Sequence, residues 1–178
     1  MADLGLIQVY TGNGKGKTTA SMGLAFRACG HGLKVCMIQF MKDNKEYGEF
    51  KASQYLPGFR IIQVGRNDFV NLENPEEIDI HLASQGWKLA KSIILSGEYD
   101  IIILDEINVA IACKLLDVNE VIAFLTDGCK SLEKKPEIIL TGRYALPQII
   151  EIAHLVTEMQ EVCHNYADGI EARQGIEF

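Results

Sequence analysis

The chain has 178 residues, 48% of them hydrophobic, and it carries 24 acidic against 17 basic side chains, a formal net charge of −7. Such a composition is globular and excludes a disordered or low-complexity protein. The length suits a single domain over residues 1–178 with a sizeable core. Because an acidic chain gains no general attraction to polyanions, we expect no nucleic acid partner.

Cysteine usage and hydropathy bear on the compartment. The five cysteines are scattered, and no two of them form a CxxC pair. Neither a disulfide framework nor a zinc site is therefore indicated, and reduced thiols fit a cytoplasmic protein. The sequence has no signal-peptide pattern and no apolar run near the ~20 residues of a membrane span, so we expect no membrane partner.

Apolar runs alternate with helical stretches along the chain. The expected strands cover residues 5–10, 34–40, 59–64, 101–105, 137–142 and 155–162. Continuous apolar runs indicate strands that are buried on both faces. The alternation therefore predicts a doubly wound α/β fold, in which helices flank a mainly parallel sheet.

Residues 75–96 give the clearest helical pattern. Pro75 suits a first helical position, and Gly97 is placed to end the helix. Trp87 lies on the apolar stripe, so we expect it in the core rather than in a ligand site. The preceding segment, residues 41–74, is the least regular part of the chain, which is typical of a functional loop.

The first strand leads into the stretch YTGNGKGKTT, residues 10–19. Glycines at positions 12, 14 and 16 allow a tight turn whose N–H groups converge, and the next helix adds a partial positive charge. Lys17 can reach phosphates, and the Thr18 hydroxyl can reach Mg²⁺. These features, between a strand and a helix, indicate a P-loop.

The match to the P-loop pattern GxxxxGK[ST] has one departure, because Thr11 stands where the pattern has its first glycine. Lys15 could contact phosphate or face solvent, and the sequence does not decide between these. We expect Lys17 on a surface loop.

Two further strand ends carry charged residues. Asp105 and Glu106 follow the strand IIIL, and in open α/β sheets ligands bind at the carboxyl ends of strands. Beside a P-loop, acids there hold or orient Mg²⁺; the alternative is an ordinary solvated strand end. Arg143 follows the strand EIIL, where it could clamp a polyphosphate or simply pair with Glu137.

These residues predict a P-loop protein that binds Mg²⁺ and a nucleoside triphosphate, and they leave the reaction open. A small-molecule kinase, an ATP-switched binding protein and an adenosyl transferase share this machinery. A kinase usually carries an Arg-rich lid over the transferred group. The arginines of this chain are scattered, which disfavours the kinase.

The particular motifs go further than the P-loop. TGNGKGKTT, FRACGHGLKVCMIQFMK, IIILDE, ILTGR and GIEARQGIEF follow one another in this order. Together they resemble the P-loop ATP:corrinoid adenosyltransferase family over nearly the whole chain. The resemblance implies a P-loop NTPase (RecA-like) fold. It also implies transfer of the 5′-deoxyadenosyl group of ATP to Co(I) of a reduced corrinoid, with release of intact triphosphate. The ATP is implied to lie in the P-loop in reversed orientation, with its γ-phosphate where other P-loop proteins hold the α-phosphate.

The resemblance also implies roles for residues. The nucleotide-binding set is Gly12, Asn13, Gly14, Lys15, Gly16, Lys17, Thr18, Thr19, Arg27 and Arg143, and the metal-binding set is Thr18, Asp105 and Glu106. Lys17, Glu106 and Phe69 are the expected catalytic residues. Arg27 would face the nucleoside or a partner subunit, although a plain surface arginine is an equal alternative.

The corrinoid side depends on the loop GRNDFVNLEN, residues 65–74, where family members use aromatic residues to crowd the lower face of cobalt. Phe69 is the aromatic residue available there, and a core position is its alternative. The resemblance further implies a homodimer and a flavoprotein or other reductase that supplies the electron for Co(I).

Overall fold

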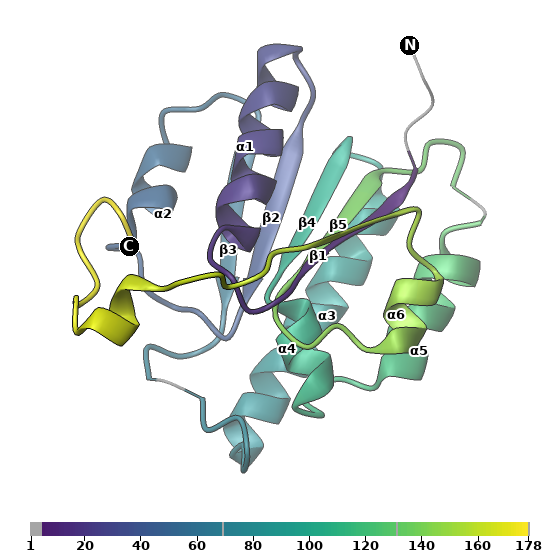
Figure 1. The fold of residues 1–178 in the computed structure, drawn as a ribbon. Coiled ribbons are helices and arrows are strands. Elements are labelled where there is room, and N and C mark those ends of the chain that lie inside the picture. Colours follow the sequence, from purple (N-terminus) through teal and green to yellow (C-terminus); the bar gives the residue numbers. More distant parts are fainter. Residues whose placement is uncertain (1–4, 69, 131, 178) are drawn as a thin grey trace.

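The computed structural model describes residues 5–68, 70–130 and 132–177. Its centre is a six-stranded sheet in the order β3-β2-β4-β5-β1-β6, with every neighbouring pair parallel (Figure 1). The strands are β1 (Ile7–Thr11), β2 (Val35–Phe40), β3 (Phe59–Val64), β4 (Ile101–Asp105), β5 (Glu137–Thr141) and β6 (Leu155–Glu158). The predicted α/β class with a parallel sheet is confirmed.

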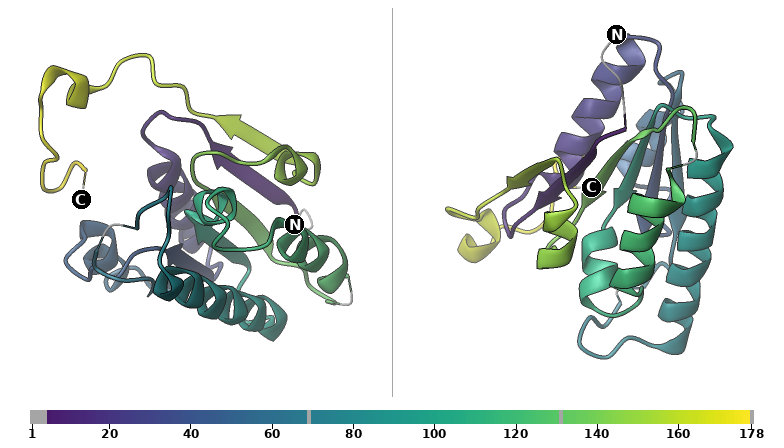
Figure 2. Two further views of the ribbon diagram at one scale, coloured as in Figure 1. Left: turned by 90° about the horizontal axis from the view of Figure 1, so that it is seen from below. Right: turned by 90° about the vertical axis from the view of Figure 1, so that its right-hand side faces the viewer.

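Helices cover both faces of the sheet (Figures 1 and 2). They are α1 (Lys17–Gly30), α2 (Gly48–Ser53), α3 (Glu77–Ser96), α4 (Ile107–Ala112), α5 (Val118–Ala123) and α6 (Pro147–Glu151), with a π-helical turn at Phe124–Gly128 and a 3₁₀ turn at Asn165–Asp168. Within the described ranges, no helix combines the length and apolar character that crossing a membrane requires.

The core consists of two layers, one on each side of the sheet. Alternate residues of a strand face opposite layers, because the side-chain period of a strand is two. On β4, Ile103 packs with Ala25 and Ala28 of α1, whereas Ile102 and Leu104 pack in the layer of α3 and α4. This double burial explains why the strands appear in the sequence as continuous apolar runs.

The predicted strand bounds hold to within two residues except at the end of the last strand. β3 and β4 have the predicted ends, whereas β6 stops at Glu158 instead of residue 162. The Met159 N–H still donates to the Thr11 carbonyl at 2.8 Å, after which the chain leaves the sheet. The last predicted strand is therefore half as long as expected.

The long helix α3 follows its prediction except at its start. Glu76 is the N-cap, and its side chain and that of Asp79 form a reciprocal capping box, so Pro75 does not occupy the first helical position. Gly97 ends the helix in the left-handed conformation (φ 68°). Trp87 is 2% exposed, and its ring meets Phe124 edge-on at 5.4 Å, which confirms the core position.

Four strands share one feature at their carboxyl ends. The residue directly after β1, β2, β4 and β5 has a positive φ: Gly12 (95°), Met41 (58°), Glu106 (63°) and Gly142 (127°). After each of these four strands the backbone thus turns sharply at the same edge of the sheet, and the residues that follow the strands are brought together there. Because left-handed backbone is uncommon for non-glycine residues, Met41 and Glu106 mark this edge as a candidate functional site.

Candidate active site

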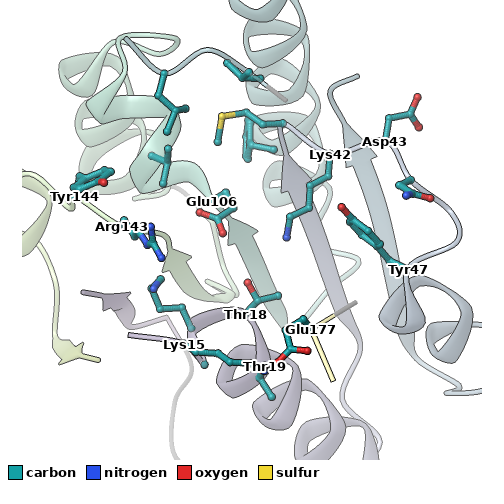
Figure 3. A pocket seen from close by; sticks show the side chains of 18 of the residues that line it. Lys15, Thr18, Thr19, Lys42, Asp43, Tyr47, Glu106, Arg143, Tyr144 and Glu177 are labelled. Carbon is teal, nitrogen blue, oxygen red and sulfur yellow. Dashed lines mark hydrogen bonds and ion pairs between the residues drawn. The ribbon is translucent and has the colours of Figure 1, made fainter. Parts of the chain in front are cut away.

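A cleft of about 770 Å³ opens at this edge of the sheet (Figure 3). Its lining includes residues 14–19, 40–44 and 66–68, together with Tyr47, Glu106, Arg143, Tyr144, His164 and Glu177. The volume lies within the ordinary range for small-molecule sites. The irregular segment predicted to be a functional loop contributes residues 41–44, 47, 66–68, 70 and 72 to the cleft.

Lys17 is the first residue of α1, and its ammonium is folded back onto the P-loop. Nζ donates to the carbonyls of Gly12 and Gly14, both at 2.7 Å. The residue is 8% exposed, so the expected surface position is wrong. Burial, followed by the charge of Arg143, lowers the pKa of Lys17. An anion in the cleft would relieve both effects.

The P-loop glycines are required by a close approach of the C-terminal segment. A Cβ on Gly12 would lie 2.4 Å from the Met159 carbonyl oxygen, and one on Gly14 would lie 2.6 Å from that of Gln160. The Gly14 N–H also donates to the Met159 carbonyl at 2.7 Å. The chain that leaves β6 therefore packs directly against the phosphate loop.

Thr11 explains the one departure from the P-loop pattern. It is the last residue of β1, and the positive-φ turn comes one residue later, at Gly12. A side chain is therefore tolerated at position 11, where its Oγ1 accepts a hydrogen bond from the Ala145 N–H at 3.3 Å.

Replacing Gly14 with alanine should loosen the P-loop, because the new methyl group would meet the backbone of residues 159 and 160. We expect a loss of about 1–3 kcal/mol in the free energy of unfolding. The control is Gly23→Ala in α1, where nothing lies within 4 Å of the added methyl group, and where helix propensity favours alanine. Urea unfolding of both variants measures the difference, and equal stability would contradict the packing.

Asp105 is the centre of a polar network beneath the cleft. Its carboxylate is fully buried and accepts from Thr18 Oγ1 at 2.8 Å, Thr141 Oγ1 at 2.7 Å, Gln39 Nε2 at 3.1 Å and Lys42 Nζ at 2.9 Å. Burial opposes the charge, but the Lys42 ion pair and the donated hydrogen bonds lower its pKa. Asp105 thus stays ionised and holds the Thr18 hydroxyl in place.

Glu106 lies next to this network but faces the cleft (Figure 3). Its backbone N–H donates to Thr141 Oγ1 at 3.0 Å. Burial, and next the neighbouring Asp105 charge, raise the pKa of Glu106. A divalent cation between Glu106 and Thr18 would offset this repulsion.

The oxygen donors of this corner are of the kind that hard divalent cations such as Mg²⁺ bind. Among the described residues, no group of three or more His, Cys, Asp or Glu side chains is arranged to hold a metal ion. Mg²⁺ needs no such group, because it binds through one or two protein oxygens together with substrate phosphates and water. Thr18 and Glu106 supply those oxygens beside the phosphate loop.

The raised pKa of Glu106 predicts how stability depends on pH. The folded protein binds this proton more tightly than the unfolded chain, whose value is near 4.5. Without divalent cations, stability should therefore fall as pH rises above 4.5, until Glu106 is ionised. Thermal melts between pH 4.5 and 8 in EDTA measure this fall.

Glu106→Gln should remove that pH dependence and make the metal-free protein more stable at neutral pH. The matched control is Glu151→Gln, an exposed carboxylate at the end of α6, which should leave the wild-type profile unchanged. A Glu106→Gln profile as steep as that of the wild type would contradict the assignment.

Two more cations line the cleft, and the sequence had left both open. Lys15 Nζ donates to Glu177 Oε1 at 2.9 Å and to the Ile176 carbonyl at 3.1 Å. Hydrogen bonds from Arg173 and Lys15 lower the pKa of Glu177 to about 2. Lys15 therefore faces the cleft, where it is paired with the C-terminal segment.

Arg143 reaches the cleft from the end of β5 (Figure 3). The alternative pairing with Glu137 is wrong, because Glu137 lies at the opposite end of that strand. Its carboxylate accepts from the backbone of Gly5 and Leu6 and from the side chain of Gln8. Arg143 is thus placed to meet an anion in the cleft that Lys17 also lines.

Not every predicted site residue lies in the cleft. The cleft lining begins at Gly14, so the exposed Asn13 lies outside it, and Gly12 takes part through its carbonyl. Arg27 is exposed in the last turn of α1 and does not line the cleft either. Phe69 lies outside the described residues.

Lys42, Tyr47 and Arg66 are among the cleft residues that sequence reasoning missed. Lys42 lies two residues past the end of β2, at the same edge of the sheet where Asp105 ends β4, but its place beside Asp105 depends on the strand order. Arg66 binds the N-terminus of α3 through Asp79 and Glu76, at 2.8 Å in each case. For Tyr47 and Arg66 the sequence offers no specific signal.

Comparison with known proteins identifies the family of this chain. The model of the family described as ATP:corrinoid adenosyltransferase BtuR/CobO/CobP matches residues 3–178. A corrinoid adenosyltransferase of Sinorhizobium sp. is 37% identical over 98% of this chain and 80% of its own length. A corrinoid adenosyltransferase of Escherichia coli is 34% identical over 98% of this chain and 86% of its own length. The chain therefore belongs to the ATP:corrinoid adenosyltransferase family.

Proposed function

We propose that this chain transfers the 5′-deoxyadenosyl group of ATP to Co(I) of a reduced corrinoid, in cobalamin biosynthesis or salvage. The observation that carries the proposal is that a single cleft has two walls, one of which is the P-loop with its neighbouring charged residues. The P-loop, with Thr18 held by Asp105, forms the first wall, and residues 66–68, Val70 and Leu72 contribute to the second. Such a cleft has places for a nucleotide and for a second substrate.

The proposed reaction asks mainly for charge stabilisation. The cobalt–carbon bond forms as the bond between C5′ and O5′ breaks, and the electron pair of that bond remains on the departing triphosphate. No proton is moved, so no general base is needed. The P-loop N–H groups, Lys17 and Arg143 would bind the triphosphate and stabilise its added charge. The Gly12 and Gly14 carbonyls now hold the Lys17 ammonium at the place where phosphate would accept from it.

We propose Mg²⁺ as the metal of this site, held by Thr18 and Glu106. When bound, it would neutralise part of the triphosphate charge. Asp105 would not contact the metal directly, because it already accepts four hydrogen bonds from protein groups. Its role would be to keep the Thr18 hydroxyl oriented. Lys15 and Thr19 border the same pocket and would contact the outer phosphates.

The test is an anaerobic assay with Mg-ATP and chemically prepared cob(I)alamin. Photolabile adenosylcobalamin together with intact triphosphate would support the proposal. ADP or inorganic phosphate formed without any corrin product would overturn it and would favour a kinase or an ATP-driven switch.

We further propose a homodimer, a flavoprotein or other reductase as electron donor, and a cytoplasmic location. The family resemblance supports the first two, and the five free cysteines support the third. One sheet that contains strands from both ends of the chain supports a single domain. Light scattering would test the dimer. Reduction of cob(II)alamin by candidate flavoproteins, with and without this protein, would test the donor.

A further inference from the structure

Lys42 is positioned by two unusual backbone features. Met41, directly before it, holds a left-handed φ of 58° although it is not a glycine. Gly65, after β3, packs so closely that a Cβ there would lie 2.4 Å from the Lys42 nitrogen. The Met41 N–H also donates to the Val64 carbonyl at 2.8 Å. A strained residue and a close glycine together turn Lys42 out of the line of β2 and into the cleft.

The Lys42 ammonium has N–H donors that are not used by the hydrogen bond to Asp105. An ammonium carries three donors, and among the described residues its recorded acceptor is Asp105 Oδ2 at 2.9 Å. Lys17 and Lys15, by comparison, each donate to two acceptors. Burial opposes the Lys42 charge, but Asp105 outweighs it and raises the pKa of Lys42. A permanent cation therefore faces the cleft with unused hydrogen-bond capacity.

The position of Lys42 complements that of the other cations. Lys17 is the first residue of α1, after the loop that follows β1. Figure 3 shows that Arg143, after β5, and Lys42, after β2, approach the cleft from different sides. Thr18 and Lys42 contact the two oxygens of the same Asp105 carboxylate, so the Thr18 hydroxyl and the Lys42 ammonium are at most about 8 Å apart. An anion seated on the P-loop would thus lie between two walls of positive charge.

We propose that Lys42 is a further substrate-binding residue, which donates to the triphosphate from the β2 wall while it keeps its ion pair with Asp105. This inference rests on the proposed function, because it takes ATP as the ligand of the cleft. It assigns Lys42 a share in binding the charge of the departing triphosphate, in addition to the P-loop.

The experiment is a calorimetric titration of tripolyphosphate into the protein in EDTA, so that no metal contributes. Lys42→Gln keeps a hydrogen bond to Asp105 but removes the charge, so the network stays partnered. We expect it to bind tripolyphosphate about tenfold or more weakly than the wild type, because a charge-assisted hydrogen bond is lost. Lys42→Arg should recover most of the affinity.

The control is Lys51→Gln on α2, which removes a lysine from an exposed pair with Glu46 and should bind like the wild type. If Lys42→Gln and the wild type bind metal-free tripolyphosphate equally, Lys42 acts only on Asp105, and the inference is overturned while the proposed function stands. If the wild type binds no tripolyphosphate at all, the inference is likewise overturned, and the anaerobic assay with Mg-ATP decides the proposed function separately. Thermal melts of each variant confirm that the compared proteins are folded.

Discussion

Replacing Lys17 with alanine should lower adenosyl transfer by about 10²–10³-fold, because one preorganised cation would be missing where the leaving triphosphate gathers charge. The same change removes the donor to the Gly12 and Gly14 carbonyls. We therefore also expect a smaller loss of stability, about 1–2 kcal/mol. Steady-state rates with Co(I) supplied chemically, together with urea unfolding, measure the two effects separately.

The control for this variant is Lys88→Ala, an exposed lysine on α3, which should change neither rate nor stability. A Lys17→Ala protein that is folded and keeps more than about a tenth of the wild-type rate would contradict the role of Lys17, because removing a single stabilising donor usually costs far more.

Asp105→Ala should be the most destabilising single change in the site. It removes a fully buried carboxylate and leaves the Lys42 ammonium and the Thr18 and Thr141 hydroxyls without their acceptor. Breaking a buried pair in this way costs about 3–5 kcal/mol. Chemical denaturation would measure the loss, and the activity that survives should be low, because Thr18 loses its orientation.

Asp127→Ala gives the contrast for that experiment. Asp127 pairs with Lys130 at the surface, where both side chains are about 70% exposed, so its removal should change stability by less than about 1 kcal/mol. Similar losses for the two variants would mean that the Asp105 network contributes no more than a solvated ion pair.

The sequence could predict most of the fold because the central strands β2, β4 and β5 are buried on both faces. β3 and β4 begin and end where their apolar runs do. β6 was predicted too long, because the alternating residues after Glu158 look like a strand but instead cross the P-loop. Local pattern alone cannot distinguish an edge strand from an extended segment that packs on a loop.

The candidate site divides in a similar way. The P-loop is one continuous stretch, and Asp105 and Glu106 are neighbours in the chain. Each of these motifs was therefore visible in the sequence. Lys42 was missed because its role depends on strand order, which places β2 next to β4 and puts Gln39 in register with Asp105. Arg27 could not be placed by spacing either, since whether a helical residue faces a cleft depends on tertiary packing.

The position of β1 in the sheet has a consequence for how the protein is made. The first strand lies between β5 and β6, which are translated long after it, and the Leu6 N–H donates to Glu137, 131 positions later. Many chains fold from the N-terminus as they emerge. Here the P-loop, although translated early, cannot take its final position until β5 and β6 have been made and can pair with β1. Nucleotide binding would therefore distinguish finished molecules from incomplete ones, and interrupted synthesis should leave products that cannot be rescued by ATP.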